Sequence, residues 1–490
     1  MNVIDHPPIA STLLEAMRAV GYSFETAMAD IIDNSVTAGA TEINVFFSPY
    51  GEPYVSVVDN GEGMSAEQLL VAMRHGSRNP LFERPVNDLG RFGLGLKTAS
   101  LSQCRRLTVI GLQGGVKSGA IWDLDEINDR KTWALLELEP HEIQRIPDID
   151  KLEKHGRGAL VVWQKLDRVF AGETEIACAL QDRIDDARTH LGLLFHRFLE
   201  SVPGQAALKI SINNAPVIPS DPYLRGSKGW QLLPRESIPV GAYSVDVEAH
   251  ILPHISRLSA EEVTKAGGDE GLRRNQGFYV YRNRRLIIWG TWFRLAKQEE
   301  MTKLARVMVD VPNALDHLWT LDIKKSTAHP PEVVRQGLRR IVDRIAERSK
   351  RVYTHRGWKA NDRGIVHAWD RIEHRGGSVS YRINREHDLF SALRSGLGDA
   401  QARLLEFFLQ TIESAFPVDA LYADMASERK MGDEKEEDAN EEILFETALL
   451  MLDAVGRETP EAAALKERLH LLDPFTKHPD IVAKIRERIK

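Results

Sequence analysis

A glycine-rich run constrains the fold of this chain more than any other segment: Gly90-Arg91-Phe92-Gly93-Leu94-Gly95-Leu96-Lys97-Thr98-Ala99-Ser100. Its closely spaced glycines lead into a helix with apolar periodicity, and backbone N–H groups at such a helix start can cradle phosphates. The run lacks the Gly-Lys-Ser/Thr ending of a P-loop. No short strand leads straight into it, as a dinucleotide fold requires. Its interpretation therefore depends on the segments that precede it.

The first of those segments is Asp30-Ile31-Ile32-Asp33-Asn34. Asp30 and Asn34 are four residues apart and share one helical face, while the two isoleucines turn toward a core. A carboxylate beside an amide suits water activation next to hydrated magnesium, because the Asn carbonyl needs only one coordination position. An amphipathic helix with exposed polar residues explains the same pattern equally well.

The second segment is Val57-Val58-Asp59-Asn60-Gly61-Glu62-Gly63-Met64, in which a β-rich run ends where the chain must turn. The Asp59 carboxylate can accept a hydrogen bond from an exocyclic amine such as that of adenine. The glycines allow a flat ring to approach the backbone. A surface turn between a strand and a helix is the alternative.

The order of the three segments resembles the GHKL ATPase superfamily, whose ATPase domain has the Bergerat fold. The superfamily contains the gyrase B subunit, a class of heat-shock chaperones, the mismatch-repair protein MutL, histidine kinases and the MORC proteins. The resemblance covers roughly residues 9–163. It looks closest to MORC-like bacterial ATPases, through Leu13 to Asn34, Gly39-Ala40, and Leu89 to Ser100.

The resemblance implies a role for each matching residue. Asn34 would hold magnesium bound to the triphosphate of ATP, and Asp30 stands where hydrolysing members carry a glutamate as general base. Asp59 would bind the adenine amine. The resemblance further places Gly61, Gly63 and Met64 at the base pocket, Gly158 at its closing position, Gly90, Arg91, Phe92, Gly93, Leu94 and Gly95 in the lid over the phosphates, and Lys97 near them.

Two departures from the family pattern affect the expected rate. Asp30 is one methylene shorter than glutamate, so base catalysis requires a closer helix or a bridging water. Ala159 stands where the family usually has threonine. Both leave open whether this is a slow ATPase or a protein that only binds the nucleotide. The acid at position 30 argues against histidine kinases, which have asparagine there.

Hydrophobic periodicity predicts a mixed α/β chain, with a GHKL sandwich over residues 1–205. The expected helices of that domain are Ile9 to Val20, Ser23 to Val36 and Glu173 to Leu199. Its expected strands are Ile43 to Ser48, Tyr54 to Val58, Leu107 to Leu112, Ala120 to Leu124, Thr132 to Leu138 and Ala159 to Trp163.

Residues 206–356 resemble the transducer domain of the gyrase, MutL and heat-shock branches. The expected strands are Leu208 to Ile212, Ser244 to Ile251, Gly277 to Tyr281, Arg285 to Trp289 and Ala305 to Val311, with a hairpin turn at Asn213 to Val217. In related ATPases a transducer lysine reaches the γ-phosphate, and Lys324 or Lys325 is the candidate here. A solvated basic loop is the alternative for that segment.

A long basic helix closes the transducer domain, from Pro331 to Arg356, with eight Arg or Lys and three acids. Such a stripe could face phosphates, but the pattern slightly favours a surface helix that pairs with the acidic linker or presents a solvated face. The expected remainder is a small mixed region over residues 357–425, an acidic linker over 426–442 and a helical tail over 443–490.

Composition limits the setting in which the chain acts. Two cysteines exclude a disulfide framework or a Cys-rich zinc site. No apolar run approaches the roughly 20 residues that span a bilayer, so we expect a cytoplasmic protein without membrane contact. Because the net charge is -7, any nucleic-acid contact must be a local patch.

These inferences define the expected function. We expect a slow, magnesium-dependent ATPase that works as an ATP-gated dimeric clamp, with double-stranded DNA as its client, in defence against foreign DNA or in repair. The chain shows no nuclease signature, so a partner nuclease or other system component is expected. The alternatives are a heat-shock-type chaperone ATPase with a protein client, and a nonhydrolysing nucleotide-gated scaffold.

Overall fold

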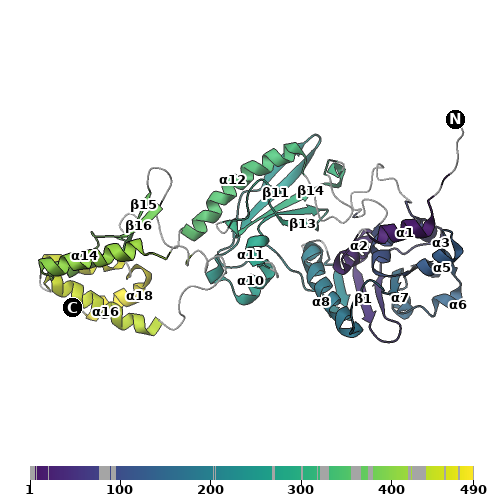
Figure 1. Ribbon diagram of the computed structural model, residues 1–490, viewed down its shortest axis with the longest axis horizontal. Helices are drawn as coiled ribbons and strands as arrows, with labels where there is room; N and C mark the ends of the chain where they lie inside the picture. The colour runs from purple at the N-terminus through teal and green to yellow at the C-terminus, as the bar shows by residue number, and fades with distance from the viewer. Residues whose placement is uncertain are drawn as a thin grey trace. The chain divides into compact units, whose positions relative to one another are not determined.

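The structure is a computed structural model, shown in Figure 1. It describes residues 6, 8–19, 21–76, 89, 95–201, 204, 206–267, 271–299, 302–316, 318–319, 330–354, 366–373, 379–417, 421, 437–456, 459–472 and 475–488. The chain forms two compact units, Met1–Tyr353 and Thr354–Lys490, and each is described by itself.

The first unit contains an eight-stranded sheet with the order β5-β4-β3-β6-β2-β1-β7-β8. Neighbouring strands are antiparallel except for β1 and β7, which run parallel. The strands are β1 (Glu42–Ser48), β2 (Tyr54–Asp59), β3 (Arg106–Gln113), β4 (Val116–Asp123), β5 (Leu136–Leu138), β6 (Gly158–Gln164), β7 (Lys209–Ile212) and β8 (Ala215–Pro216). The central strands alternate side chains between two buried faces, so helices must cover both sides.

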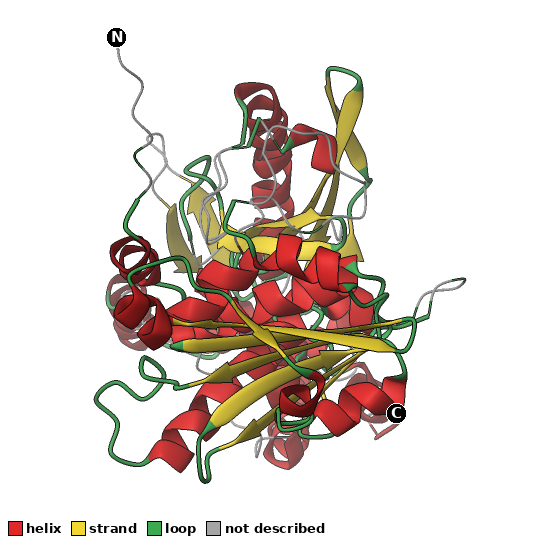
Figure 2. Cartoon of the chain, turned by 90° about the vertical axis from the view of Figure 1, so that its right-hand side faces the viewer, coloured by secondary structure: helices red, strands yellow, loops and turns green. Residues whose placement is uncertain are grey.

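Helices cover both faces of this sheet, and Figure 2 shows its strands between them. The larger layer consists of α1 (Ala10–Arg18), α2 (Phe24–Thr37), α3 (Ala66–Met73), α4 (Gly95–Gln103), α5 (Leu124–Arg130), α8 (Ile176–Leu194) and the short α9 (His196–Leu199). Ile31 and Ile32 of α2 pack there against Val57 of the sheet. The smaller layer, α6 (Pro140–Ile143) and α7 (Ile149–His155), covers the opposite face over Val58 and Ile110.

A second sheet follows in the same unit, with the order β10-β11-β14-β12-β13 and β9 paired to β11. Its strands are β9 (Gln231–Leu232), β10 (Glu236–Val240), β11 (Tyr243–Ile251), β12 (Gly277–Arg282), β13 (Arg285–Thr291) and β14 (Ala305–Val311). Two short helices, α10 (Ala260–Gly267) and α11 (Gly271–Arg274), precede β12, while η1 (Ile255–Arg257) and η3 (Asn313–Leu315) are single turns.

The long helix α12 (Glu332–Thr354) covers one face of the second sheet. It buries Val334, Leu338, Ile341 and Ile345, a spacing that forms one helical stripe. The other face buries Tyr279 and Tyr281, which pack with Leu193 of α8. The second sheet therefore packs directly on helices of the first domain.

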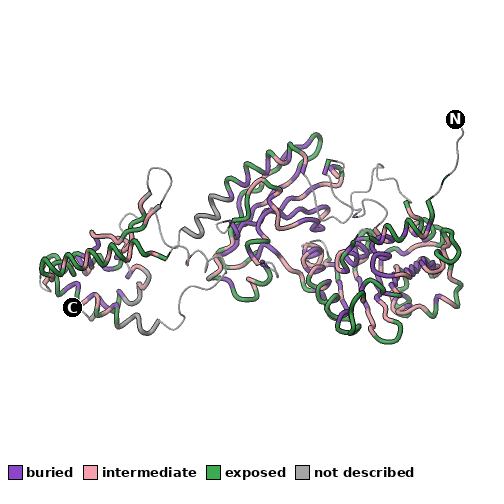
Figure 3. The backbone as a smooth tube through the Cα atoms, in the orientation of Figure 1, coloured by how far each residue is buried: buried purple, intermediate pink, exposed green. Residues whose placement is uncertain are grey.

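The second unit consists of a hairpin and helices. Its elements are β15 (Trp369–Glu373), β16 (Val379–Ile383), α13 (Asp388–Ser395), α14 (Asp399–Ser414), α16 (Glu437–Val455), α17 (Pro460–Arg468), η4 (Leu469–Leu471), η5 (Phe475–Lys477) and α18 (Pro479–Arg488). Its core joins Ala448 and Leu452 of α16 to Leu465 and Ile485. As Figure 3 shows, much of α14 is exposed. No helix within the described ranges is long and apolar enough to cross a membrane.

The mixed α/β class and the mostly helical C-terminal region predicted from the sequence are confirmed, but three boundaries differ. The strand expected at Leu208 to Ile212 forms as β7 and pairs with β1, so the first sheet extends beyond residue 205. The strand expected from Thr132 begins only at Leu136. Helix α16 begins at Glu437, inside the segment predicted as an acidic linker. The remaining domain boundaries stay predictions.

Candidate functional site

Helix α2 carries the acid and the amide of the first motif. Its apolar residues pack into the core and hold Asp30 at 6% exposure, whereas Asn34 is exposed. The Tyr22 hydroxyl donates to Asp30 Oδ2 at 3.1 Å, and Asn34 Nδ2 donates to the Asp30 backbone carbonyl at 3.0 Å. Because that bond uses the amide nitrogen, Oδ1 is the atom with which Asn34 can bind a cation.

The start of α4 lies beside Asp30. Gly95 is the first residue of α4, and a Cβ placed on it would lie 3.6 Å from Asp30 Oδ2. The Asp30 carboxylate therefore lies close to the N-terminal end of α4. Unsatisfied N–H groups and the helix dipole favour negative charge at such a position. The structure thus brings together the first motif and the end of the glycine-rich run.

Asp59 ends β2 and is buried at 4% exposure. Its Oδ2 accepts a 2.7 Å hydrogen bond from Ser35 Oγ, and its Oδ1 accepts from the backbone N–H groups of Gly61 at 2.9 Å and Ala159 at 3.3 Å. Burial raises the pKa of the Asp59 carboxyl, although these hydrogen bonds lower it. Ser35 lies next to Asn34, so one hydrogen bond joins the helix of the first motif to the carboxylate of the second.

Three of the predicted glycines mark close backbone approaches. A Cβ would lie 2.8 Å from the Ala38 carbonyl oxygen at Gly61, and 2.1 Å from the Leu112 oxygen at Gly63, where φ is +72°. At Gly158, where φ is +125°, it would lie 1.8 Å from the Asp59 oxygen. Close packing between strands and turns therefore requires glycine at these positions. The sequence had suggested a different reason, the approach of a flat ring such as adenine to the backbone.

Met64 and Gly111 extend this packing. Met64 packs against the first core. A Cβ on Gly111 would lie 2.5 Å from the Met64 carbonyl oxygen, so Gly111 was a missed member of the site. Its signal was a glycine inside an otherwise apolar strand, which indicates close backbone approach.

Lys97 has a different setting from the one predicted. Its side chain is buried at 2% exposure, and Nζ donates to the Ala72 carbonyl at 2.7 Å. Because Ala72 lies in the last turn of α3, this bond caps that helix and joins it to α4. Burial lowers the pKa of Lys97 to about 8. Contact between Lys97 and a phosphate stays a prediction.

Several predicted residues lie outside the described residues. They are Gly90, Arg91, Phe92, Gly93 and Leu94 of the glycine-rich run, and Lys324 and Lys325 of the transducer loop. Leu89, directly before the run, is buried, and its N–H donates to Thr37 Oγ1 at 3.2 Å. Leu89 therefore lies next to the C-terminal end of α2.

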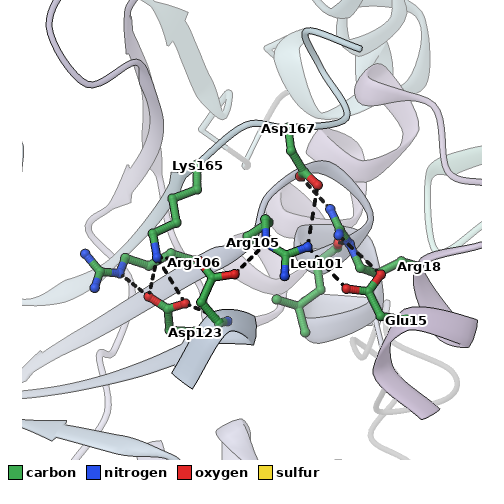
Figure 4. A network of polar contacts seen from close by, with 9 residues as sticks. Glu15, Arg18, Leu101, Arg105, Arg106, Asp123, Lys165 and Asp167 are labelled. Atoms are coloured by element: carbon green, nitrogen blue, oxygen red, sulfur yellow. Dashed lines mark hydrogen bonds and ion pairs between the residues drawn. The ribbon is translucent and has the colours of Figure 1, made fainter. Parts of the chain in front are cut away.

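A charge network fastens α1 and α4 (Figure 4). Buried Arg18 donates through Nε to the Leu101 carbonyl at 2.7 Å and through Nη2 to Asp167 Oδ1 at 2.5 Å. Arg105 Nε donates to Asp125 at 2.8 Å. Charged hydrogen bonds of this kind are stronger than neutral ones. The network holds the C-terminal end of the helix whose first turn lies beside Asp30.

The oxygen atoms present suit magnesium and adenine. Asn34 offers an amide oxygen of the kind that binds magnesium, and the nearby Asp30 carboxylate suits activation of a water next to the hydrated ion. The described part of the chain contains no group of three His, Cys, Asp or Glu residues able to hold a metal. Because magnesium dehydrates reluctantly and binds substrate phosphates, magnesium held by Asn34 would complete its shell with water and phosphate oxygens. Asp59, with a buried carboxylate held by three donors, is suited to accept a hydrogen bond from an amine.

Comparison with known proteins identifies the family of the domain that carries these motifs. Residues 22–158 match the family described as histidine kinase-, DNA gyrase B-, and HSP90-like ATPase. The chain thus contains an ATPase domain of the GHKL superfamily. Within that superfamily, it is similar to the DNA mismatch repair protein MutL.

The MutL of Thermosipho africanus is 30% identical over 91 residues, which are 18% of this chain and 16% of that protein. The MutL of Dictyoglomus thermophilum is 42% identical over 96 residues, which are 19% and 17% of the two proteins. The match thus spans about a sixth of the length of these relatives. A crystal structure of the N-terminal domain of a DNA repair protein covers 71% of this chain and 99% of its own, with 13% identity and a TM-score of 0.42.

Proposed function

We propose that this chain binds ATP with magnesium and hydrolyses it slowly at the site formed by α2, the end of β2 and the start of α4. The observation that carries the proposal is the hydrogen bond from Ser35 to Asp59. It joins Asp59, the acid that would accept a hydrogen bond from the adenine amine, to the helix that carries Asp30 and Asn34. The match to GHKL ATPases over residues 22–158 supports the same assignment.

Each residue has a separate role in this proposal. Asp59 accepts from the adenine amine, Asn34 holds magnesium through Oδ1, and Asp30 orients the attacking water and takes its proton. Magnesium would neutralise charge on the phosphates. The hydrogen bond from Tyr22 holds the Asp30 carboxylate in place, which lowers the entropy cost of positioning it.

The remaining proposed contacts rest on the family resemblance. Gly61, Gly63, Met64 and Gly158 form the adenine side, residues 90–95 and Lys97 the phosphate side, and Lys324 or Lys325 the γ-phosphate sensor. The backbone packing of Gly63 and Gly158 supports their part, because it shapes the turn that follows Asp59.

We further propose that ATP gates a homodimeric clamp on double-stranded DNA. Arg339, Arg340 and Arg344 are exposed on α12, whose apolar stripe packs on the second sheet. Exposed arginines on one helix provide phosphate contacts without sequence preference. Arg344 also pairs with Glu236, so part of this charge is already compensated. Relatives named for DNA mismatch repair support a DNA client. Action in repair or in defence against foreign DNA, a partner nuclease and a cytoplasmic location belong to the same proposal.

The test is steady-state ATP turnover by the full chain with magnesium, with and without long double-stranded DNA. We expect Asp30→Asn to lower kcat at least about 100-fold while ATP still binds. Glu25→Gln, on the same helix, is the matched control and should retain turnover. Turnover that is unaltered in Asp30→Asn would contradict the assignment of the base. Absence of turnover in the wild type, with ATP bound, would leave a nucleotide-gated scaffold.

The DNA arm uses the double variant Arg339→Glu and Arg340→Glu. We expect DNA to raise wild-type turnover, and the double variant to lose that increase while its basal rate stays unchanged. Turnover that responds to an unfolded protein but not to DNA would contradict the DNA client and favour a chaperone-type ATPase.

A further inference from the structure

A buried ion pair joins the helix of the candidate ATP site to the second sheet. Arg285 Nε, at the start of β13, lies 3.0 Å from Asp33 Oδ1 on α2, and the two side chains are 5% and 3% exposed. Arg285 Nη1 also donates to the Leu286 carbonyl at 2.7 Å. The guanidinium lies over the ring of Phe195, 5.5 Å from its centroid. The pair is thus enclosed by protein on several sides.

Burial makes this pair a rigid connection. Two charges away from water are tolerated only while they remain paired in good geometry. If α2 moved relative to β13, the two charges would separate inside the protein, which is strongly unfavourable. The helix and the strand are therefore expected to move together rather than to slide past each other.

Asp33 lies on the same helix as the residues of the candidate ATP site. It directly precedes Asn34 and follows Asp30 by three residues, all within α2. A hydrogen-bonded helix transmits a small displacement of one turn to its neighbours with little loss. A ligand that pulls on Asp30 or Asn34 will therefore displace Asp33 as well.

Arg285 is placed to pass that displacement on. It begins β13, which pairs with β12, and β12 pairs in parallel with β14. The Arg282–Arg285 pair closes the hairpin between β12 and β13. A shift of Arg285 therefore acts on the end of the hairpin and, through it, on the centre of the second sheet.

We propose that Arg285 is a positioning residue that couples the nucleotide state of α2 to the second sheet through Asp33. The inference rests on the proposed ATP site. It differs from the proposed γ-phosphate sensor, because this coupling contacts neither ATP nor magnesium. By linkage, the second sheet biases nucleotide affinity as much as the nucleotide biases the sheet.

The chain offers a matched control for this inference. Arg197 of α9 pairs with Asp310 of β14 at 2.6 Å, with side chains 23% and 28% exposed. The Arg197 guanidinium lies 4.8 Å from the ring centroid of Tyr281. This second pair also joins the helical layer to the second sheet, but it does not start from α2. Its loss should weaken packing without changing the response to nucleotide.

The experiment follows hydrogen exchange of the β13 backbone, residues 285–291, with and without magnesium and ATP in the full chain. Wild type is compared with Arg285→Gln, Asp33→Asn, their double variant and the Arg197→Gln control. ATP affinity and kcat are measured on each protein. Arg285→Lys restores the charge without the planar fork, so it tests for partial rescue.

We expect ATP to slow exchange of residues 285–291 in wild type and in Arg197→Gln. In Arg285→Gln and Asp33→Asn this change should disappear, and the double variant should resemble either single one. We expect the Kd for ATP to change by a similar factor in Arg285→Gln and in Asp33→Asn and to stay unchanged in Arg197→Gln, because coupling between two sites is reciprocal in binding. If Arg285→Gln does not fold, Arg285→Lys is expected to show a reduced response.

Three results would overturn the inference. Exchange in wild type that does not change on ATP binding would show that β13 does not sense the nucleotide. An unchanged response in Arg285→Gln or in Arg285→Lys would show that Arg285 does not carry it. An equal loss in Arg197→Gln would assign the effect to packing in general. Absence of ATP binding in wild type is a separate result, which overturns the proposed function and this inference with it.

Discussion

The α-carbon of Gly158 lies so close to the backbone carbonyl of Asp59 that an added Cβ would stand 1.8 Å from its oxygen. Gly158 begins β6, which pairs with β2 up to Asp59. The next residue, Ala159, donates its N–H to the Asp59 carboxylate at 3.3 Å. The position of Asp59 therefore depends on the absence of a side chain at residue 158.

We expect Gly158→Ala to lower the free energy of unfolding by about 3 kcal/mol or more, because the new methyl group meets backbone that has no room to yield. Gly156→Ala is the matched control: Gly156 also has positive φ, +71°, but an added Cβ there would have nothing within 4 Å. It should cost about 1 kcal/mol. Denaturant unfolding of both variants measures the difference, and equal losses would contradict the proposed close approach.

Asp59→Asn is expected to separate stability from binding. Burial raises the pKa of Asp59 in the folded chain. The free energy of unfolding therefore falls as pH rises from the ordinary carboxyl pKa through the raised folded pKa, where the buried carboxyl becomes charged. Replacing it with the neutral amide should therefore raise stability at pH 7. ATP affinity should fall about 10- to 100-fold, because a charged acceptor for the adenine amine is lost.

Asp148→Asn is the control for that variant. Asp148 accepts a 2.6 Å hydrogen bond from Ser56, which also lies on β2. Replacing Asp148 with asparagine should leave ATP affinity unchanged. Calorimetric titration with ATP and thermal unfolding at pH 7 measure both effects, and unaltered affinity in Asp59→Asn would remove Asp59 from the adenine site.

Lys97→Met is expected to change how stability depends on pH. Burial lowers the pKa of Lys97 to about 8 in the folded chain from an ordinary 10.5. Below pH 8 the buried charge lowers the free energy of unfolding by its full amount, and this destabilisation decreases as pH rises from 8 toward 10.5. The stability of wild type relative to Lys97→Met should rise by about 2 kcal/mol between pH 7 and pH 9.5. Lys154→Met, at an exposed lysine, is the control variant. A difference in stability between wild type and Lys97→Met that stays constant with pH would refute the burial of the Lys97 charge.

His250→Phe is expected to protect the fold against acid. His250 is 2% exposed, and neither ring nitrogen has a hydrogen-bond partner among the described residues. Burial lowers the pKa of His250 to about 4, so stability is lost as pH falls from 6.5 to 4 while the unfolded chain takes up the proton.

The phenylalanine variant keeps a ring against Tyr223, whose centroid is 4.3 Å away, and has no titrating nitrogen. Between pH 7.5 and pH 5 we expect the free energy of unfolding of wild type to fall by about 2 kcal/mol more than that of His250→Phe. Denaturant unfolding at the two pH values measures this, with exposed His141→Phe as the control. Parallel losses in wild type and His250→Phe would contradict the prediction.

Local patterns predicted the elements of the fold well, because apolar spacing reports which face of a helix or strand is buried. The strand expected from Ala305 to Val311 is β14 itself. The pattern could not show that β7 joins the first sheet, since pairing with β1 depends on contacts more than 160 residues apart. A strand has the same alternation whichever sheet it enters.

The site was predictable as motifs but not as contacts. Asp59 and Ser35 lie 24 residues apart, and only the packing of α2 against the sheet brings them together. Asp33 reads as a polar residue of an amphipathic helix, yet the second sheet buries it against Arg285, 252 residues away. Lys97 follows a glycine-rich run, which favours a phosphate contact, whereas the fold gives its amine the carbonyl of Ala72.

The most direct test of the central claim is calorimetric titration of the full chain with ATP, in magnesium and in EDTA, for wild type and Asn34→Ala. The proposed site predicts one ATP bound per chain in magnesium, with affinity lowered at least about tenfold by EDTA and by Asn34→Ala. ATP binding that is indifferent both to magnesium and to Asn34, or no ATP binding by wild type, would contradict the claim that α2 holds a magnesium–ATP site.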